Sequence, residues 1–237
     1  MTDNIYNPKY VKDLFDKMSG SYERVNYITS FSFSLRWRKQ FLKHIVPSDN
    51  KLEVIDLMTG MGEVWGPMRD KFPNANLSAL DFSEGMIKNA DSKNEKHYNG
   101  SVTVLHQNLL NNQLPANHYD IVLCAFGLKT FDAEQLAVLA NEVKRILKPG
   151  GQFSMIEVSE PENAILRFLY RLHLSKVVPI AGKIMLGNPT EYRMLWKYTS
   201  AFKNALAATA IFKKAGLDAR YVKYFNGCAT GIAGTKA

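Results

Sequence analysis

Two glycines and one carboxylate in this sequence have the residue types and the spacing of a nucleoside-binding site. Gly60 and Gly62 follow an apolar run in the segment VIDLMTGMGEVW, which spans residues 54–65. Glycine at such a turn permits positive φ and lets the backbone approach a ligand closely. Asp81 lies about twenty residues further on, a spacing at which a carboxylate can accept hydrogen bonds from both hydroxyls of a ribose. The alternatives are a structural tight turn at the glycines and an ordinary N-terminal helix charge at Asp81.

The residue after the second glycine distinguishes between nucleoside cofactors. A pyrophosphate cofactor requires the pattern G-x-G-x-x-G, whereas this chain reads GMGEVWG over residues 60–66. Glu63 would place a carboxylate at the start of the following helix, where it would repel a pyrophosphate. The same carboxylate suits the cationic amino group and the sulfonium of S-adenosylmethionine. The turn therefore favours S-adenosylmethionine as the cofactor and methyl transfer as the chemistry.

Short apolar runs alternate with segments of helical period, and these elements must position the turn. The alternation is typical of a parallel sheet covered by helices, so the sequence predicts an α/β fold. Ligands of such sheets bind beyond the carboxyl ends of the strands, where the glycine turn lies. Strands are predicted at 52–57, 76–81, 102–107, 119–126 and 152–158, with β-like runs at 218–225 and 226–237. Helices are predicted at 63–71, after an N-cap at Ser83, over 136–146 before Pro149, and at 202–214.

The composition narrows the classes of partner. The chain has 237 residues and a formal net charge of +8, which favours anionic partners. It has no arginine-rich arm and no RNP-like aromatic motif, so specific nucleic-acid binding is not expected. Cys124 and Cys228 cannot form a disulfide framework and lie in no zinc-binding pattern, so no metal site is expected and a reducing cytoplasm fits best. No apolar segment approaches roughly 18 residues, which leaves peripheral membrane contact open.

Motifs along the whole chain add to the glycine turn. They are FDKMSGSYERVNYITSFSFSLRWRK at residues 15–39, DLMTGMGE, ALDFSEGM, YDIVLCAFGLK, RILKPGG, EVSEP and GIAGTK. With these motifs the chain resembles, from about Val11 to Lys236, the ubiquinone/menaquinone biosynthesis C-methyltransferase family, a UbiE-like branch of the class I S-adenosylmethionine-dependent methyltransferases. The resemblance implies a Rossmann-like fold with a mostly parallel seven-stranded sheet and helices on both faces. It also implies one domain over residues 1–237, with an N-terminal helical cap at 1–50 and a substrate-lid insertion at 160–200, and it leaves a homodimer open.

The resemblance implies a set of binding residues. The cofactor-binding residues would be Gly60, Met61 and Gly62 in the turn, Asp81 on the ribose, Phe82 beside the adenine, Asn108 and Leu109 flanking the base, and Ala125 on the methionine side. Tyr22 and Asn26 would line the substrate side of the pocket. Asn108 can both donate and accept hydrogen bonds, which suits an adenine edge, although it is also an ordinary residue for the start of a loop.

The chain departs from the family pattern at three places. Met61 stands where the family usually has threonine, and Glu63 stands where it has aspartate. The segment GLKTF stands where the family typically reads G-L-R-N, so Lys129 and Thr130 replace an Arg-Asn pair. Lys129 keeps the positive charge but lacks the planar fork of arginine, and Thr130 cannot replace both amide functions of asparagine. These departures open the acceptor to phenolic or heteroaromatic molecules besides the quinol-like ring of the family.

Three residues are candidates for chemistry at the acceptor. Methyl transfer is an in-line displacement, so the protein must align the acceptor and stabilise or remove charge on it. Lys129 could stabilise a phenolate, or it could be a solvated lysine before the next helix. Glu157 could act as a base or hold the acceptor, or it could bind backbone N–H groups at the end of its strand. His173 could also be catalytic, although a lone histidine in an amphipathic segment is more often structural.

The segment 164–187, AILRFLYRLHLSKVVPIAGKIMLG, has two interpretations. Its apolar residues alternate with Arg167, Arg171, Lys176 and Lys183, a pattern that suits a helix at a membrane surface. The interpretation favoured here is a lid over an apolar acceptor, because Pro179 and Gly182 should break the helix. A lipophilic acceptor would make both interpretations true.

The sequence predicts an enzyme that transfers a methyl group from S-adenosylmethionine to a small aromatic acceptor, with C-methylation favoured and a role in quinone biosynthesis implied by the resemblance. Two other functions stay open. A methyltransferase fold could bind the cofactor without methyl transfer, as a cyclase or a partner subunit, and the altered Lys129-Thr130 pair is the support for it. A nucleic-acid methyltransferase would fit the basic charge, but the chain lacks an amino-methylating N/D-P-P-[YF] motif, and Cys124 falls inside a predicted buried strand.

Overall fold

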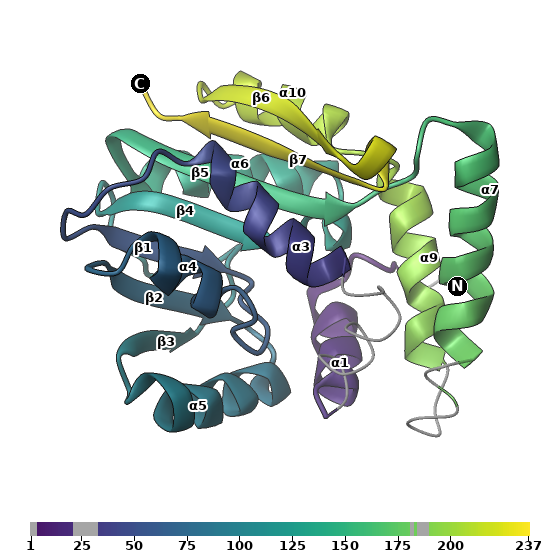
Figure 1. The fold of residues 1–237 in the computed structure, drawn as a ribbon, viewed down its shortest axis with the longest axis horizontal. Coiled ribbons are helices and arrows are strands. Elements are labelled where there is room, and N and C mark those ends of the chain that lie inside the picture. Colours follow the sequence, from purple (N-terminus) through teal and green to yellow (C-terminus); the bar gives the residue numbers. More distant parts are fainter. Residues whose placement is uncertain (1–3, 21–32, 181–182, 184–189) are drawn as a thin grey trace.

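A seven-stranded sheet forms the centre of the computed structural model, which describes residues 4–20, 33–180, 183 and 190–237 (Figure 1). The strand order is β3-β2-β1-β4-β5-β7-β6. The pairs among β1 to β5 are parallel, and β7 is antiparallel to both β5 and β6. The strands are β1 Glu53–Leu57, β2 Asn76–Asp81, β3 Val102–His106, β4 Tyr119–Ala125, β5 Leu147–Val158, β6 Asp218–Tyr224 and β7 Ala229–Thr235. The predicted class, a mostly parallel seven-stranded α/β sheet, is confirmed.

Helices cover both faces of the sheet because successive residues of each strand are buried on opposite sides. Val54 belongs to a core cluster with side chains of α3, η1 and α4, whereas Ile55 belongs to a cluster with α6 and α10. The front helices in Figure 1 are α3 Phe33–Gln40, η1 Phe41–His44 and α4 Trp65–Lys71, and the rear ones are α6 Ala133–Ile146 and α10 Leu206–Lys214. Helix α5, Glu84–Tyr98, lies along the β3 edge, and its N-cap is Ser83 as predicted.

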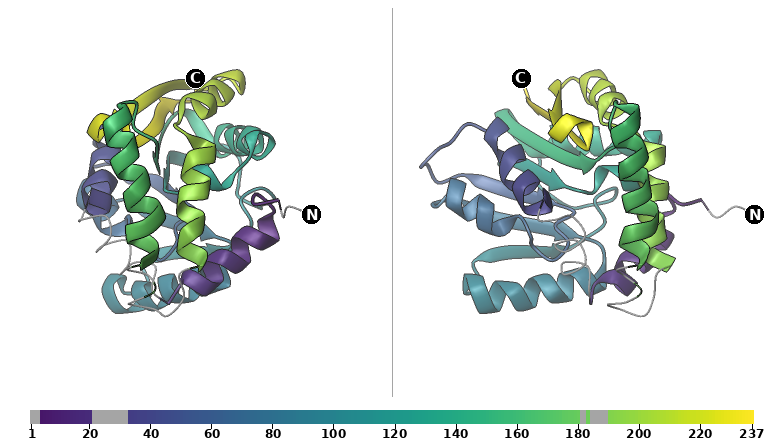
Figure 2. Two further views of the ribbon diagram at one scale, coloured as in Figure 1. Left: turned by 90° about the vertical axis from the view of Figure 1, so that its right-hand side faces the viewer. Right: turned by 45° about the vertical axis from the view of Figure 1, so that its right-hand side comes forward.

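A further group of helices lies beyond the carboxyl ends of the parallel strands (Figure 2). It consists of α1 Pro8–Met18, α7 Ala164–Leu172, the π-helix η3 His173–Val177 and α9 Thr190–Phe202. Leu14 and Met18 of α1 pack with Leu174, Val178 and Tyr198 in a separate apolar cluster. The N-terminal segment and the insertion after β5 are thereby joined at the edge of the sheet where ligands bind. None of the described helices is long and apolar enough to cross a membrane.

The helix predicted at 202–214 is present as α10 and ends at Lys214 as expected, but it begins at Leu206 and not at Phe202. Helix α9 ends at Phe202 and α10 begins at Leu206. Lys203 between them has a φ of 58°, which no α-helix accommodates. The side chain of Asn204 accepts a hydrogen bond from the Leu206 N–H at 3.0 Å and so holds the start of the second helix. The apolar period is unaffected by this turn, and it therefore concealed the break.

The break expected at Pro179 is also absent, because residues 178–180 are helical. The distortion lies one turn earlier, in the wide π-helical turn of η3. A proline inside a helix has no N–H to donate and its ring clashes with the carbonyl one turn back, so a wider preceding turn relieves both problems. Gly182, the other expected break, lies outside the described residues. Strand β5 likewise begins at Leu147 rather than at residue 152, with a shift of register between Tyr119 and Ile121 on β4.

Candidate active site

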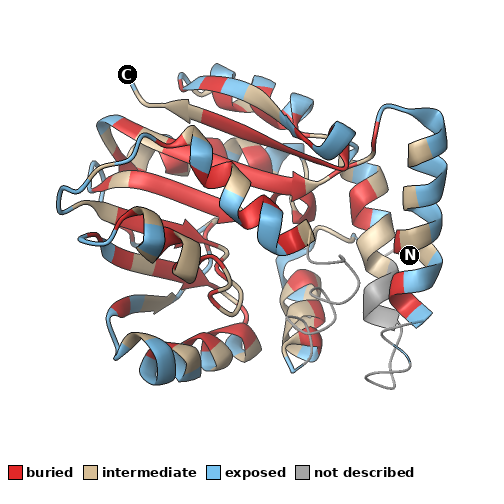
Figure 3. Cartoon of the chain, viewed as in Figure 1, coloured by how far each residue is buried: buried red, intermediate tan, exposed pale blue. Residues whose placement is uncertain are grey.

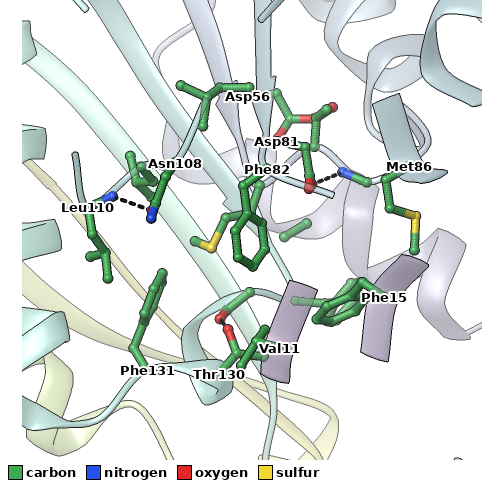
Figure 4. Close-up of a pocket in the computed structure, with 18 of the residues that line it drawn as sticks. Val11, Phe15, Asp56, Asp81, Phe82, Met86, Asn108, Leu110, Thr130 and Phe131 are labelled. Atoms are coloured by element: carbon green, nitrogen blue, oxygen red, sulfur yellow. Dashed lines mark hydrogen bonds between the residues drawn. The ribbon is translucent and has the colours of Figure 1, made fainter. Parts of the chain in front are cut away.

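A cavity of about 80 Å³ opens beyond the carboxyl ends of β1, β2 and β4. We call it the first cavity. Figure 4 shows Asp56 and Asp81 on one side of it and Val11 and Phe15 of α1 across from them. Phe82 points between these two sides. The N-terminal helix therefore covers the end of the sheet that carries the glycine turn.

The glycine turn has the backbone that its sequence predicts. Gly60 and Gly62 have φ angles of 59° and 76°, values that side-chain-bearing residues rarely adopt. The Gly60 N–H donates to Asp81 Oδ2 at 2.8 Å, which ties the turn to the end of β2. At Gly62 a Cβ would lie 2.6 Å from the ring of Trp65. Gly60 therefore faces the first cavity, while Gly62 allows α4 to pack against the turn.

Two buried carboxylates stand at the floor of the first cavity. Asp56 Oδ2 accepts a hydrogen bond from Thr59 Oγ1 at 2.6 Å, but Asp56 Oδ1 has no hydrogen-bond partner among the described residues. Complete burial raises the pKa of Asp56 to about 7. Asp81 accepts from the N–H groups of Gly60 and Ser83, and burial still raises its pKa to about 6. Both carboxylates would gain from a cationic or hydroxyl-bearing ligand in the cavity.

Most of the predicted cofactor-binding residues lie around the first cavity. Its lining includes Gly60, Asp81, Phe82, Asn108, Leu109 and Ala125. Met61 and Gly62 are not part of the lining, since the Met61 N–H turns to Glu63 Oε2 at 3.1 Å. Asn108 Oδ1 accepts from the Leu110 N–H at 3.0 Å, so its side chain also closes its own loop. Tyr22 and Asn26, the predicted substrate residues, lie outside the described residues.

A second, larger cavity of about 300 Å³ adjoins the first one. Its walls are mainly apolar side chains from α3, α7, η3 and α9. They include Phe33, Trp37, Val158, Leu166, Leu174, Val178, Leu195 and Phe225. Arg38 and Phe126 line both cavities, so these two residues form the boundary between them. The insertion after β5 thus supplies one wall of an apolar chamber beside the first cavity.

Arg38 is a buried cation at this boundary, and it is not among the site residues expected from the sequence. Its Nη2 lies 3.5 Å from Glu63 Oε1, and its guanidinium lies over the Phe126 ring at 5.2 Å from the centroid. Neither Arg38 Nε nor Trp37 Nε1 has a hydrogen-bond partner in the part of the chain that the structure describes. Buried donors without a partner are costly, so both are suited to a ligand oxygen. The signal in the sequence was a charged residue beside an aromatic one in a helix otherwise packed on the sheet.

Lys129 and Glu157 form a buried ion pair below the second cavity. Lys129 Nζ lies 2.7 Å from Glu157 Oε1, and the Lys129 N–H donates to Glu157 Oε2 at 3.1 Å. Glu157 also accepts from the Val158 N–H at 2.7 Å, and Lys129 Nζ donates to the Phe126 carbonyl at 3.1 Å. Lys129 is therefore not the solvated lysine of the alternative interpretation. It lines the second cavity, as does His173, whereas Glu157 is fully buried behind it.

Comparison with known proteins decides the family. A model of the ubiE/COQ5 methyltransferase family matches residues 3–236. The chain belongs to this family. It is similar to proteins named demethylmenaquinone methyltransferase from Listeria monocytogenes serotype 4b (strain CLIP80459), at 30% identity over 95% of each chain, and from Staphylococcus saprophyticus subsp. saprophyticus, at 31% identity over 96% of each chain. The protein is an S-adenosylmethionine-dependent methyltransferase of the UbiE type.

Solved structures share the fold at low sequence identity. A putative S-adenosyl-L-methionine-dependent methyltransferase from Methanococcus maripaludis superposes with a TM-score of 0.66 at 14% identity, and 94% of each chain is covered. Phosphoethanolamine N-methyltransferase 2 of Haemonchus contortus, in complex with S-adenosyl-L-methionine, gives a TM-score of 0.61 at 15% identity over 92% of this chain and 60% of that one. These likenesses bear on the fold alone.

The lining of the first cavity fits the cofactor of the family. S-adenosylmethionine carries an ammonium, a ribose and an adenine, and each needs a different neighbour. Asp56 Oδ1 is an unpartnered buried acceptor among the described residues, which suits the ammonium. Each Asp81 oxygen accepts one N–H bond and keeps a second lone pair for a ribose hydroxyl. Phe82 and Leu109 offer apolar surface to the adenine.

Proposed function

We propose that this enzyme methylates a ring carbon of a lipophilic, quinol-like acceptor held in the second cavity. The observation that carries the proposal is that the cofactor cavity and a larger apolar cavity meet at Arg38 and Phe126. A methyl donor and an aromatic acceptor placed in the two cavities would face each other across that boundary. The relatives named demethylmenaquinone methyltransferase support an acceptor of the quinone type.

The residues of the first cavity would bind the cofactor and fix its orientation. Bound S-adenosylmethionine supplies an electrophilic methyl group on its sulfonium. Asp56 would hold the ammonium, Asp81 the ribose hydroxyls, and Phe82 the adenine, with Asn108 and Leu109 beside the base and Ala125 beside the methionine chain. Gly60 lets the backbone approach closely, and Arg38 holds Glu63 toward the loop. Together they fix the direction in which the methyl group points.

On the acceptor side, Arg38 is the residue best placed to stabilise charge. A phenolate oxygen pushes electron density onto the neighbouring ring carbon, which gains the methyl group and then loses its proton. Arg38 Nε, a buried donor without a partner among the described residues, would donate to that oxygen. His173 lines the same cavity and is the candidate for receiving the ring proton. Lys129 could add positive charge, but only while paired with Glu157.

The test supplies methyl-labelled cofactor together with reduced short-chain demethylmenaquinol, and compares the wild type with Arg38→Lys and Arg38→Gln. Labelled product methylated at a ring carbon, located by NMR, is the expected result. Loss of one donor to a developing oxyanion lowers kcat by about a hundredfold or more, so Arg38→Gln should do so while S-adenosylhomocysteine still binds. Methylation at oxygen, or no product from any quinol, would contradict the proposed reaction. An unchanged kcat in Arg38→Gln would contradict only the proposed role of Arg38 and not the proposed reaction.

A further inference from the structure

Helix α7 presents an apolar face to the outside of the molecule. Ile165, Phe168, Leu169 and Leu172 are 74%, 66%, 54% and 48% exposed. Their spacing of three, four and seven residues places them on one side of the helix. No residue of α7 is buried. Figure 3 shows this helix as the outermost element beside α9, with exposed residues along its length. We call these four side chains the α7 outer face.

The surroundings of the α7 outer face are basic. Arg167, Arg171, Lys176 and Lys183 are all exposed. Arg171 lies over the ring of Trp196 at 5.9 Å, which holds it near the helix. Glu162, an acid at this end of the insertion, is paired with Lys223 at 2.6 Å. Apolar side chains flanked by cations complement a surface of anionic headgroups over hydrocarbon.

The α7 outer face continues into the second cavity. Leu166, Tyr170 and His173 line that cavity from the inner side of the insertion. Leu169 lines the cavity and is also more than half exposed, and Phe225 in η4, Phe225–Gly227, lines it while 50% exposed. Leu169 and Phe225 therefore belong both to the outer surface of the protein and to the wall of the second cavity.

We propose that the α7 outer face docks on the surface of an anionic lipid bilayer, with its apolar side chains in the boundary between headgroups and acyl chains. The entrance beside Leu169 and Phe225 then faces the lipid, so that a lipophilic acceptor reaches the second cavity without crossing water. This route rests on the proposed acceptor, whereas the docking itself does not. A second copy of the chain fits less well, because a twofold contact through this face would bring Arg167 and Arg171 of both copies together.

The test measures binding to phospholipid vesicles by co-sedimentation and needs no acceptor. Vesicles of phosphatidylcholine and phosphatidylglycerol in equal parts are compared with phosphatidylcholine alone. The variant is Ile165→Glu/Phe168→Glu, two residues of the outer face that do not line the cavity. The matched control is Val46→Glu/Val138→Glu, which adds the same charges at exposed apolar positions outside α7.

The wild type and the control should bind the anionic vesicles about tenfold more tightly than the neutral ones, since each basic residue near the surface contributes attraction. The α7 variant should lose about tenfold or more of that binding. Its far-UV circular dichroism spectrum and its midpoint of thermal unfolding should equal those of the wild type, which shows that the variant is folded. Equal vesicle binding by the two variants would overturn the proposal. A second outcome would also overturn the proposal: the wild type is a dimer that does not bind vesicles, and the α7 variant is a monomer. If the protein docks on vesicles as expected but transfers no methyl group, the docking is supported and only the proposed function is contradicted.

Discussion

Asp56 combines complete burial with a carboxylate that is only partly hydrogen-bonded. It is fully buried at the end of β1, and one of its oxygens has no partner among the described residues. A buried carboxylate of this kind is tolerated where a ligand later pairs with it. The raised pKa of about 7 determines the direction in which the stability of the protein changes with pH. Since the unfolded chain releases this proton near the ordinary pKa of 3.8, the ligand-free protein loses stability as pH rises from about 4 to about 7.

The first prediction concerns the pH dependence of cofactor binding. S-adenosylhomocysteine keeps the ammonium, so it should bind about tenfold more tightly at pH 8 than at pH 6, because Asp56 must be ionised to pair with it. Asp56→Asn should bind weakly and lose most of this dependence. Calorimetric titration across this range measures both. Methylthioadenosine, which lacks the amino acid, serves as the control ligand. If the binding of S-adenosylhomocysteine to Asp56→Asn still depends steeply on pH, a group other than Asp56 is responsible for the titration.

The second prediction concerns the Lys129–Glu157 pair. Lys129→Met leaves Glu157 charged and buried, which should lower the free energy of unfolding by about 3–5 kcal/mol. The double variant Lys129→Met/Glu157→Gln removes both buried charges, and its one amide oxygen can still accept from one of the two N–H groups, of Lys129 and Val158, that bind different oxygens of Glu157. It should therefore be more stable than Lys129→Met alone. Urea denaturation of both variants and of the wild type gives the comparison, and a double variant less stable than the single one would show that the pair itself stabilises the fold.

Spacing along the chain predicted some site residues and not others. The glycines and Asp81 could be placed because a strand, a turn and a second strand lie close together in sequence. Arg38 depends on contacts with Glu63 and Phe126, which lie 25 or more positions away and meet only in the folded chain. The aromatic neighbour of Arg38 in the sequence does not by itself distinguish such an arginine from one that anchors a helix. The two interpretations of Lys129 stayed open for the same reason, because its partner Glu157 lies in β5, 28 positions further along the chain.

At the scale of elements, the strands were predictable and the irregular joints were not. Alternation and β-branched residues placed β1 to β4 within a residue or two. The turn at Lys203 and the π-helical turn at His173–Val177 arise from backbone geometry that carries no apolar signal. Both joints flank the helices that wall the second cavity. The least predictable part of the chain is therefore the part that shapes the acceptor site.

The third prediction compares two glycines of neighbouring elements. Gly62→Ala would place a Cβ 2.6 Å from the Trp65 ring at a φ of 76°, so it should lower the free energy of unfolding by about 1–3 kcal/mol. Gly66→Ala lies inside α4, where the nearest atom would be 3.7 Å away. Alanine favours a helix, so this control should be neutral or stabilising by up to about 1 kcal/mol. Thermal unfolding of both variants is the measurement. Equal losses would mean that the turn does not depend on Gly62.

At the scale of the whole molecule, the sequence predicts one domain. Both cavities are built from segments that are far apart in the chain: the first joins α1 to β1, β2 and β4, and the second joins α3 to α7 and α9. We expect one unfolding transition, with equal calorimetric and van't Hoff enthalpies. S-adenosylhomocysteine at about 100 times its Kd should add about 2.7 kcal/mol of stability to that single transition. A ligand that shifts only one of two transitions would divide the chain into separate units.

The position of β7 has a consequence for the order in which the protein is completed. Strand β6 touches the rest of the sheet only through β7, which is inserted antiparallel between β5 and β6. Strand β6 precedes β7 in the chain, so its N–H and C=O groups can join the sheet only after β7 has been translated. A chain stalled anywhere before residue 229 carries an unfinished sheet whose β5 edge is open to other chains.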